Sequence, residues 1–319
     1  MKVNKGEVNR ELALTGRLIQ TFVPSFSQNK LPIARSLMNL IKGSCKVDLS
    51  YEQIYIKRED GTDLRVCIYK PNTMNEPLPV VVWMHGGGYG LGIPEQNEKF
   101  FKRMIDETNV VIVSPDYTLS FEKPYPAAIN DCYLALKFTK DNASLLNIKP
   151  NQIMIGGESA GGGLTAALSI IARDKKEVNI SFQMPLYPML DDRMIFPSTI
   201  DNNDPVWDSK SNKEAWKVYL GDLFGTDDVP PYASPMREID FSNLPPTLTY
   251  VGSLEVFKDE TMDYVDKLLK SSNEVYFQLY EGCYHSFDML NSNTVIANEA
   301  FTFLFTTLRY AIKNYFKEN

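Results

Sequence analysis

The stretch GGESAGGG, residues 156–163, places one hydroxyl group, that of Ser159, among glycines. Residues 157–161 match the pattern G-x-S-x-G, with the apolar run IMIGG before Ser159 and the apolar run LTAALSIIA after it. In this pattern the serine lies on a sharp turn from a strand to a helix, where it can act as a nucleophile. So short a match also fits a glycine-rich turn without chemistry, so the catalytic partners of Ser159 have to be found elsewhere in the chain.

A serine hydroxyl is a weak nucleophile at neutral pH and needs a base within hydrogen-bond reach. The chain contains two histidines, His85 and His285. His285 lies in EGCYHSFDML, directly after the last predicted strand. The base has this place in the hydrolase order Ser…Asp/Glu…His. We therefore predict that His285 is the base, although a lone loop histidine can also be structural.

The third catalytic group should be an acid between Ser159 and His285 that follows a strand. The segment YVGSLEVFKDE offers Glu255, Asp259 and Glu260. Glu255 lies closest to the strand end, whereas the other two acids suit the first turn of the next helix, where negative charge is favourable. We favour Glu255 to orient the histidine, with Asp259 as the alternative.

A second glycine-rich stretch, HGGGY, follows the third predicted strand and begins with His85. Consecutive glycines there bring backbone N–H groups close to a ligand, as in the oxyanion loop of lipases and esterases. We predict an oxyanion hole made by the N–H groups of Gly87, Gly88 and Ala160, with His85 in a structural role. A phosphate-binding loop is the weaker alternative, because no Gly-Lys-Ser/Thr follows.

Four aromatic residues are candidates for an apolar substrate pocket, and ordinary core packing is the alternative for each of them. They are Tyr89, Trp207, Trp216 and Phe287.

Short apolar or alternating runs predict eight strands. They cover residues 51–58, 64–70, 78–84, 109–115, 151–157, 180–188, 246–252 and 275–282. The first two alternate apolar and polar residues around a turn and predict an antiparallel pair. Three of the others, at 78–84, 109–115 and 151–157, are continuous and rich in β-branched residues, as in a parallel sheet buried on both faces.

Helix-like segments separate these strands, at about 95–108, 126–141, 160–174, 259–272 and 293–317. The alternation predicts an α/β fold with a mostly parallel eight-stranded sheet and helices on both faces. Residues 1–50 hold two amphipathic helix candidates, and residues 190–235 interrupt the alternation. We expect residues 1–50 to form an N-terminal helical cap segment, and residues 51–319 to form the catalytic domain with a cap insertion near 190–235.

The composition of the 319 residues is that of a globular protein, with a formal net charge of −7. A negative charge argues against nucleic acid or an anionic membrane as a partner. No apolar run is long enough for a signal peptide or a membrane helix. Four widely spaced cysteines fit neither a zinc site nor a disulfide framework, so we expect a cytoplasmic protein. The last strand, VYFQLY, could be an exposed edge that pairs two copies in a homodimer.

Four motifs, taken together, resemble the hormone-sensitive-lipase-like family of α/β-hydrolase esterases. They are HGGGYGLG, SPDYTLSFEKPYPAAINDC, GGESAGGG and SNLPPTLTYVGSLEVFKDE, and the resemblance covers about residues 50–317. It implies the α/β-hydrolase fold with a helical cap, no cofactor, and hydrolysis of short-chain carboxylic esters.

The chain departs from the family pattern at several positions. Glu255 and Glu158 stand where the family commonly has aspartate, and Thr118 and Phe121 replace its arginine and proline. We expect Glu158 to brace the oxyanion loop, and Asp116 of SPDY to hold that loop by hydrogen bonds.

The sequence therefore predicts a serine esterase that acts on small-molecule esters through an acyl-enzyme. An amidase or peptidase would use the same nucleophilic groups and stays open as an alternative. A non-catalytic ligand receptor on the same fold is a further alternative, because fold alone does not fix function.

Overall fold

The computed structural model describes residues 2–4, 6–23 and 25–319. Its centre is one sheet. The strands of that sheet are β1 (Ser50–Lys57), β2 (Asp63–Lys70), β3 (Leu78–Met84), β4 (Val111–Pro115), β5 (Ile148–Glu158), β6 (Phe182–Leu186), β7 (Thr247–Gly252) and β8 (Val275–Tyr280). Their order across the sheet is β1-β2-β4-β3-β5-β6-β7-β8. The eight predicted strands are confirmed to within a few residues.

The sheet is antiparallel at one edge and parallel elsewhere. β1 pairs antiparallel with β2, and β2 with β4, whereas all the other neighbours are parallel. Every residue of β3, LPVVVWM, is buried. Parallel strands covered on both faces need such continuous apolar sequence. The fold class predicted from the sequence is therefore confirmed.

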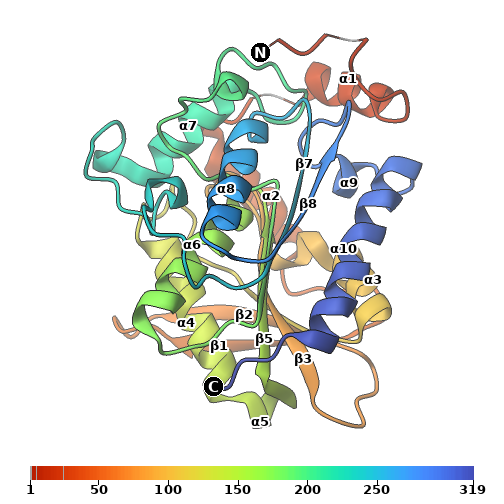
Figure 1. Ribbon diagram of the computed structural model, residues 1–319, viewed down its shortest axis with the longest axis vertical. Helices are drawn as coiled ribbons and strands as arrows, with labels where there is room; N and C mark the ends of the chain where they lie inside the picture. The colour runs from red at the N-terminus through yellow and green to blue at the C-terminus, as the bar shows by residue number, and fades with distance from the viewer. Residues whose placement is uncertain (1, 5, 24) are drawn as a thin grey trace.

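Two groups of helices cover the two faces of the sheet (Figure 1). One face carries α3 (Glu98–Thr108) and α10 (Val295–Asn314), and the other carries α4 (Ala127–Asp141), α6 (Ala160–Lys175) and α8 (Lys258–Lys270). Alternate residues of β3 serve the two cores, because successive side chains of a strand point to opposite faces. Val80 and Val82 pack in the core with α4 and α6, and Val81 and Trp83 pack in the core with α3 and α10. Two helices of four residues, α5 (Ala143–Leu146) and α9 (Phe287–Leu290), complete the core elements.

The N-terminal segment and the insertion near 190–235 contact each other. They contribute α1 (Ala13–Phe22), α2 (Leu31–Met38) and α7 (Ser209–Leu220), and α1 and α7 lie at the same end of the molecule, at the top of Figure 1. The ring of Phe26 packs edge-on against Trp207 at 5.4 Å, and the Phe26 N–H donates to Oγ of Ser211 at 3.1 Å. The expected division into a cap and a catalytic domain stays a prediction.

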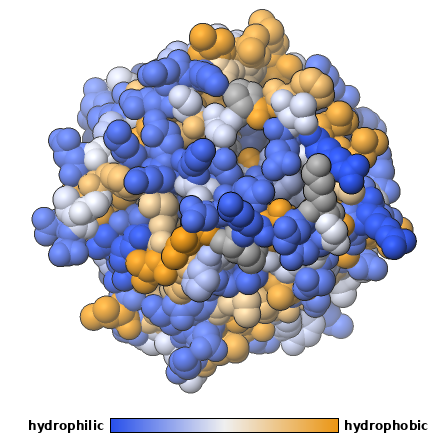
Figure 2. All heavy atoms as spheres, turned by 90° about the horizontal axis from the view of Figure 1, so that it is seen from above, coloured by the Kyte–Doolittle hydropathy of each residue, from blue (hydrophilic) through white to orange (hydrophobic). Residues whose placement is uncertain are grey.

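The end of the molecule seen from above is mostly hydrophilic and carries separate hydrophobic patches (Figure 2). The helix α1 lies at this end and exposes apolar side chains, among them Leu14 and Phe22. None of the helices in the described ranges combines the length and the apolar character needed to cross a membrane.

Candidate active site

Ser159 lies at the turn between β5 and α6. Its backbone angles are φ 59° and ψ −120°, in a region that non-glycine residues rarely adopt and that costs conformational energy. Two backbone hydrogen bonds hold the turn. The Ser159 N–H donates to the carbonyl of Leu186 at 3.0 Å, and the Ser159 carbonyl accepts from the N–H of Met189 at 3.1 Å. The end of β6 and the loop after it therefore fix the strained conformation of Ser159.

The two glycines of G-x-S-x-G are needed because strand and helix pass each other closely. A Cβ atom at Gly157 would lie 2.5 Å from the carbonyl oxygens of both Gly161 and Met84. A Cβ at Gly161 would lie 2.0 Å from the Met84 oxygen. No side chain fits at either position, so glycine alone allows this turn.

The structure brings Ser159, Glu255 and His285 together. Nε2 of His285 lies 2.9 Å from Oγ of Ser159, and Nδ1 of His285 lies 2.6 Å from Oε2 of Glu255. The other carboxylate oxygen of Glu255 accepts the Gly252 N–H at 2.7 Å. All three side chains are buried. The three groups thus form a continuous line of contacts that could carry a proton from the hydroxyl to the imidazole.

The two rival acids are engaged elsewhere. Asp259 accepts the backbone N–H of Ser198 at 2.8 Å, and Glu260 accepts that of Leu190 at 2.8 Å. Both lie in the first turn of α8, as predicted.

Burial lowers the pKa of His285, because a charged imidazolium is poorly solvated inside the protein. A neutral imidazole can accept the serine proton. When Nδ1–H donates to Glu255, the lone pair of Nε2 faces the serine hydroxyl, which is the tautomer that a general base requires.

A buried carboxylate from the insertion, Asp204, also holds the histidine loop. Its Oδ2 accepts the backbone N–H of His285 at 2.9 Å, and its Oδ1 accepts the backbone N–H groups of Val206 and Trp207 at 2.7 and 3.1 Å. Burial raises the pKa of Asp204 to about 6. Sequence reasoning missed this residue, because it lies in an irregular segment between Ser159 and Glu255, the first and second members of the triad order.

The predicted oxyanion donors lie in the loop after β3, at Gly87 and Gly88, and at Ala160, the first residue of α6. Gly87 and Gly88 have φ angles of 127° and 60°, which glycine adopts readily. Across the described ranges, the N–H groups of Gly87, Gly88 and Ala160 donate to no protein acceptor. They are therefore free to donate to an oxyanion.

Glu158 contacts the oxyanion loop directly. Its carboxylate accepts the backbone N–H of Gly86, the indole N–H of Trp83 and the amide of Asn97, at 2.7, 2.7 and 2.8 Å. Burial raises the pKa of Glu158 to about 7. These contacts are of the bracing kind expected from the sequence, and Asn97 was not foreseen.

His85 lies at the start of the oxyanion loop and contacts no member of the line Ser159–His285–Glu255. Its ring stacks on Tyr117 at 4.2 Å, its carbonyl accepts the Tyr117 hydroxyl at 2.7 Å, and its Nδ1 lies 2.9 Å from the Gly86 oxygen. Burial lowers the pKa of His85 to about 4, so the ring is neutral.

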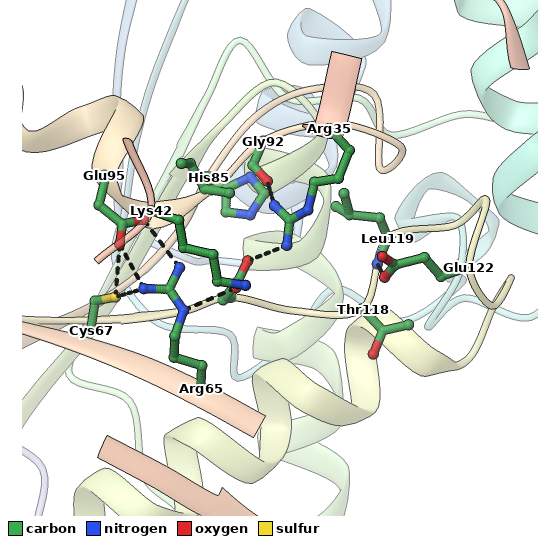
Figure 3. Close-up of polar contacts among 12 residues, drawn as sticks. Arg35, Lys42, Arg65, Cys67, His85, Gly92, Glu95, Thr118, Leu119 and Glu122 are labelled. Carbon is green, nitrogen blue, oxygen red and sulfur yellow. Dashed lines mark hydrogen bonds and ion pairs between the residues drawn. The ribbon is translucent and has the colours of Figure 1, made fainter. Parts of the chain in front are cut away.

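Asp116, which was expected to hold the oxyanion loop by hydrogen bonds, connects to it through a second side chain. Its carboxylate pairs with Arg35, Lys42 and Arg65, and Arg35 continues to the Gly92 carbonyl of the loop (Figure 3). The sequence did not reveal this because the arginine comes from the N-terminal segment.

The four aromatic pocket candidates do not lie together. Trp207 is at the site: a Cβ at Gly88 would lie 2.4 Å from its ring, and its ring centroid is 6.3 Å from that of His285. Tyr89 and Trp216 are fully buried and pack on Tyr219.

Phe287 belongs to the core of the opposite sheet face, where it packs on Tyr280 and Tyr250 at 5.3 and 6.5 Å. Its assignment to the pocket is not supported, because α9 turns its first side chain into that core. Among the described residues, no group of His, Cys, Asp and Glu could hold a metal ion.

Comparison with known proteins places this geometry in a family. Residues 81–289 match the family described as the alpha/beta hydrolase fold. The chain belongs to the α/β-hydrolase fold family. It is 30% identical over 257 residues to the carboxylesterase NlhH of Mycobacterium tuberculosis, covering 79% of this chain and 80% of the relative.

Solved structures agree with this assignment. A bacterial heroin esterase superimposes with a TM-score of 0.89 at 28% identity, covering 97% of this chain and 99% of the other. The esterase LipW of Mycobacterium marinum gives 0.85 at 26% identity, covering 96% of each chain. The comparisons support a serine esterase of the α/β-hydrolase fold, that is, a carboxylic ester hydrolase. The family resemblance and the enzyme class predicted from the sequence are confirmed.

Proposed function

We propose that this protein hydrolyses short-chain carboxylic esters through an acyl-enzyme on Ser159, with His285 as base and Glu255 as the acid that orients it. The observation that carries the proposal is the unbroken line of contacts from Glu255 through His285 to Ser159, at 2.6 and 2.9 Å. The carboxylesterase and esterase relatives support the reaction class.

In the first step, Oγ of Ser159 attacks the ester carbonyl carbon while Nε2 of His285 takes the hydroxyl proton. The new C–O bond pushes the carbonyl electron pair onto oxygen. The N–H groups of Gly87, Gly88 and Ala160 receive this oxyanion, each contributing about 3 kcal/mol to the transition state. The imidazolium is stabilised by Glu255, which accepts its Nδ1–H.

In the second step, the tetrahedral intermediate collapses and the bond to the leaving alkoxide breaks. Nε2–H of His285 gives its proton to that oxygen, so the alcohol leaves and Ser159 carries the acyl group. A water molecule then repeats the attack with His285 as base. The carboxylic acid leaves, and the serine hydroxyl is restored.

Trp207 supports a preference for small acyl or alcohol groups. Its ring packs over Gly88 and against Phe26, so apolar side chains of the insertion and of the N-terminal segment crowd the oxyanion loop. We propose that acyl chains from acetyl to about hexanoyl are accepted, as the family resemblance implies, and that Trp207 contacts them.

Purified protein tests the proposal directly. Ser159→Ala should abolish hydrolysis of p-nitrophenyl butyrate while the thermal unfolding midpoint stays close to that of the wild type. Undiminished hydrolysis by this variant would overturn the proposed mechanism. A p-nitrophenyl series from acetate to laurate measures the chain preference, and the matching anilide separates an esterase from an amidase.

We further propose that the protein is cytoplasmic and pairs through β8. All four cysteines are free thiols, which suits a reducing compartment. The strand β8 lies at the sheet edge and is mostly half-buried, so its backbone is available to a second copy. Cell fractionation and light scattering of the purified protein test the two statements.

A further inference from the structure

The N-terminal helix α2 makes a polar contact with the oxyanion loop through the side chain of Arg35. Its Nη1 donates to the carbonyl of Gly92 at 2.5 Å, and its Nη2 lies 2.9 Å from Oδ1 of Asp116 (Figure 3). The guanidinium is mostly buried. It therefore bridges the end of the HGGGYGLG loop and the segment that follows β4.

Gly92 lies directly against the start of that loop. A Cβ at Gly92 would lie 2.2 Å from Nδ1 of His85 and 2.5 Å from the Gly86 oxygen. The N–H of Leu91 donates to the Gly87 carbonyl at 2.9 Å, and a Cβ at Gly87 would lie 2.2 Å from the Leu91 oxygen. Residues 91–92 thus contact the backbone of residues 85–87. A group that fixes the Gly92 carbonyl therefore also fixes the loop that carries the proposed oxyanion donors Gly87 and Gly88.

The other end of the bridge is anchored firmly. Asp116 also pairs with Arg65 at 3.0 Å and with Lys42 at 2.8 Å. Arg65 pairs in turn with the buried Glu95 at 2.6 Å, and Glu95 accepts the N–H of Gly43 at 2.7 Å. This network joins β2, the segment that follows β4 and the N-terminal segment (Figure 3). Charge-assisted hydrogen bonds of this kind hold their partners in one geometry.

We propose that Arg35 is a positioning residue of the esterase reaction: it fixes the Gly92 carbonyl relative to Asp116 and so aligns the Gly87 and Gly88 amides with the oxyanion. Through it, the N-terminal segment sets the turnover rate of a site to which it contributes no reacting group. The inference rests on the proposed function, because the aligned amides matter only if an oxyanion forms.

Lys42 provides a matched control. It pairs with the same carboxylate from the same N-terminal segment, but it makes no contact with residues 85–92 within the described ranges. Arg35→Met and Lys42→Met each remove one cation from Asp116, and only the first also releases Gly92. If the cations that pair with Asp116 had only a structural role, both variants would show similar effects.

The test measures kcat, KM and the affinity for a trifluoromethyl ketone, which forms an oxyanion on the nucleophilic serine. In Arg35→Met we expect kcat to fall by about tenfold to a hundredfold, because small misplacements of oxyanion donors are costly. We expect the ketone affinity to fall by a similar factor, with KM changed less than about threefold if the loss is confined to the transition state. Lys42→Met should stay within about twofold of the wild type in kcat, because it leaves the contacts of Arg35 with Gly92 and Asp116 in place.

Equal kcat values for the two methionine variants would overturn the inference while leaving the esterase proposal intact. A wild-type protein without esterase activity would instead remove the proposed function. If Arg35→Met does not fold, Arg35→Lys keeps a cation beside Asp116 but lacks the two-armed fork. Its kcat should still lie below that of Lys42→Met, and a wild-type kcat in Arg35→Lys would also overturn the inference.

Discussion

Oε2 of Glu255 lies 2.6 Å from Nδ1 of His285, although the two residues are separated by the whole of α8 and β8. The opposite carboxylate oxygen is held by the N–H of Gly252, at the end of β7. The longer arm of glutamate, compared with the aspartate of the family pattern, is accommodated by this backbone contact. The geometry thus favours Glu255 over Asp259 as the acid.

Replacing Glu255 should therefore be far more damaging than replacing Asp259. We expect Glu255→Gln to lower kcat by about 10⁴-fold, as when the acid of a serine triad loses its charge and the histidine adopts the wrong tautomer. Asp259→Asn is the control, because Asp259 contacts Ser198 and not the histidine. Steady-state kinetics on p-nitrophenyl butyrate would assign the acid to Asp259 if the two effects were reversed.

The pH profile of kcat/KM should report the lowered pKa of His285. Burial favours the neutral imidazole, so the base stays active as the pH falls below the ordinary histidine pKa of about 6.5. We expect activity to be lost on the acid side with an apparent pKa below that value. Rates at constant ionic strength check this, and an apparent pKa above about 7 would show that the site favours the imidazolium.

Glu158 should make stability depend on pH in an unusual direction. Its pKa is raised to about 7 in the folded protein, so between about pH 4.5 and 7 the folded state binds more protons than the unfolded state. The contribution of Glu158 to the free energy of unfolding is therefore full at acid pH and falls as the pH rises through this window. The decrease is about 3 kcal/mol at most.

Urea unfolding of the wild type and of Glu158→Gln at several pH values isolates the contribution of Glu158 to the free energy of unfolding. The free energy of unfolding of the wild type, minus that of the variant, should decrease from pH 5 to pH 8. A difference that grows with pH would mean that the ionised carboxylate, with its three donors, is the form that the fold prefers.

Gly88→Ala should disturb both the oxyanion loop and Trp207. The new methyl group would come within 2.4 Å of the indole ring, at a backbone φ of 60° that alanine disfavours. We expect lower kcat and lower stability. Because Trp207→Leu removes the clash, the double variant should be more stable than the sum of the single effects by about 1 kcal/mol. Strict additivity would show that the ring does not meet this position.

The sequence predicted most of the sheet because buried parallel strands leave continuous apolar runs, such as LPVVVWM. It also predicted which serine, histidine and glutamate meet, since the strand–turn–helix pattern and the chain order restrict the choices. The catalytic roles of these residues stay predictions. Phe287 was misjudged because an aromatic residue beside the predicted base looks the same in sequence whether it faces the site or the core.

Contacts of the N-terminal segment and of the insertion with the rest of the chain could not be predicted. Asp204 and Arg35 reach the site from the insertion and from the N-terminal segment, and neither lies in a recognisable motif. The same holds at Thr118, where the family pattern has arginine. There Arg58 and Thr118 share the carboxylate of Asp131, so a guanidinium reaches this segment from the end of β1 instead.

The most direct test of nucleophilic attack by Ser159 is to trap the acyl-enzyme. Protein quenched in acid during turnover of p-nitrophenyl butyrate is digested and analysed by mass spectrometry. The account predicts one butyryl group on the peptide that contains Ser159, present in the wild type and absent from Ser159→Ala and His285→Ala. A butyryl group on another residue, or full turnover without any acylated serine, would contradict it.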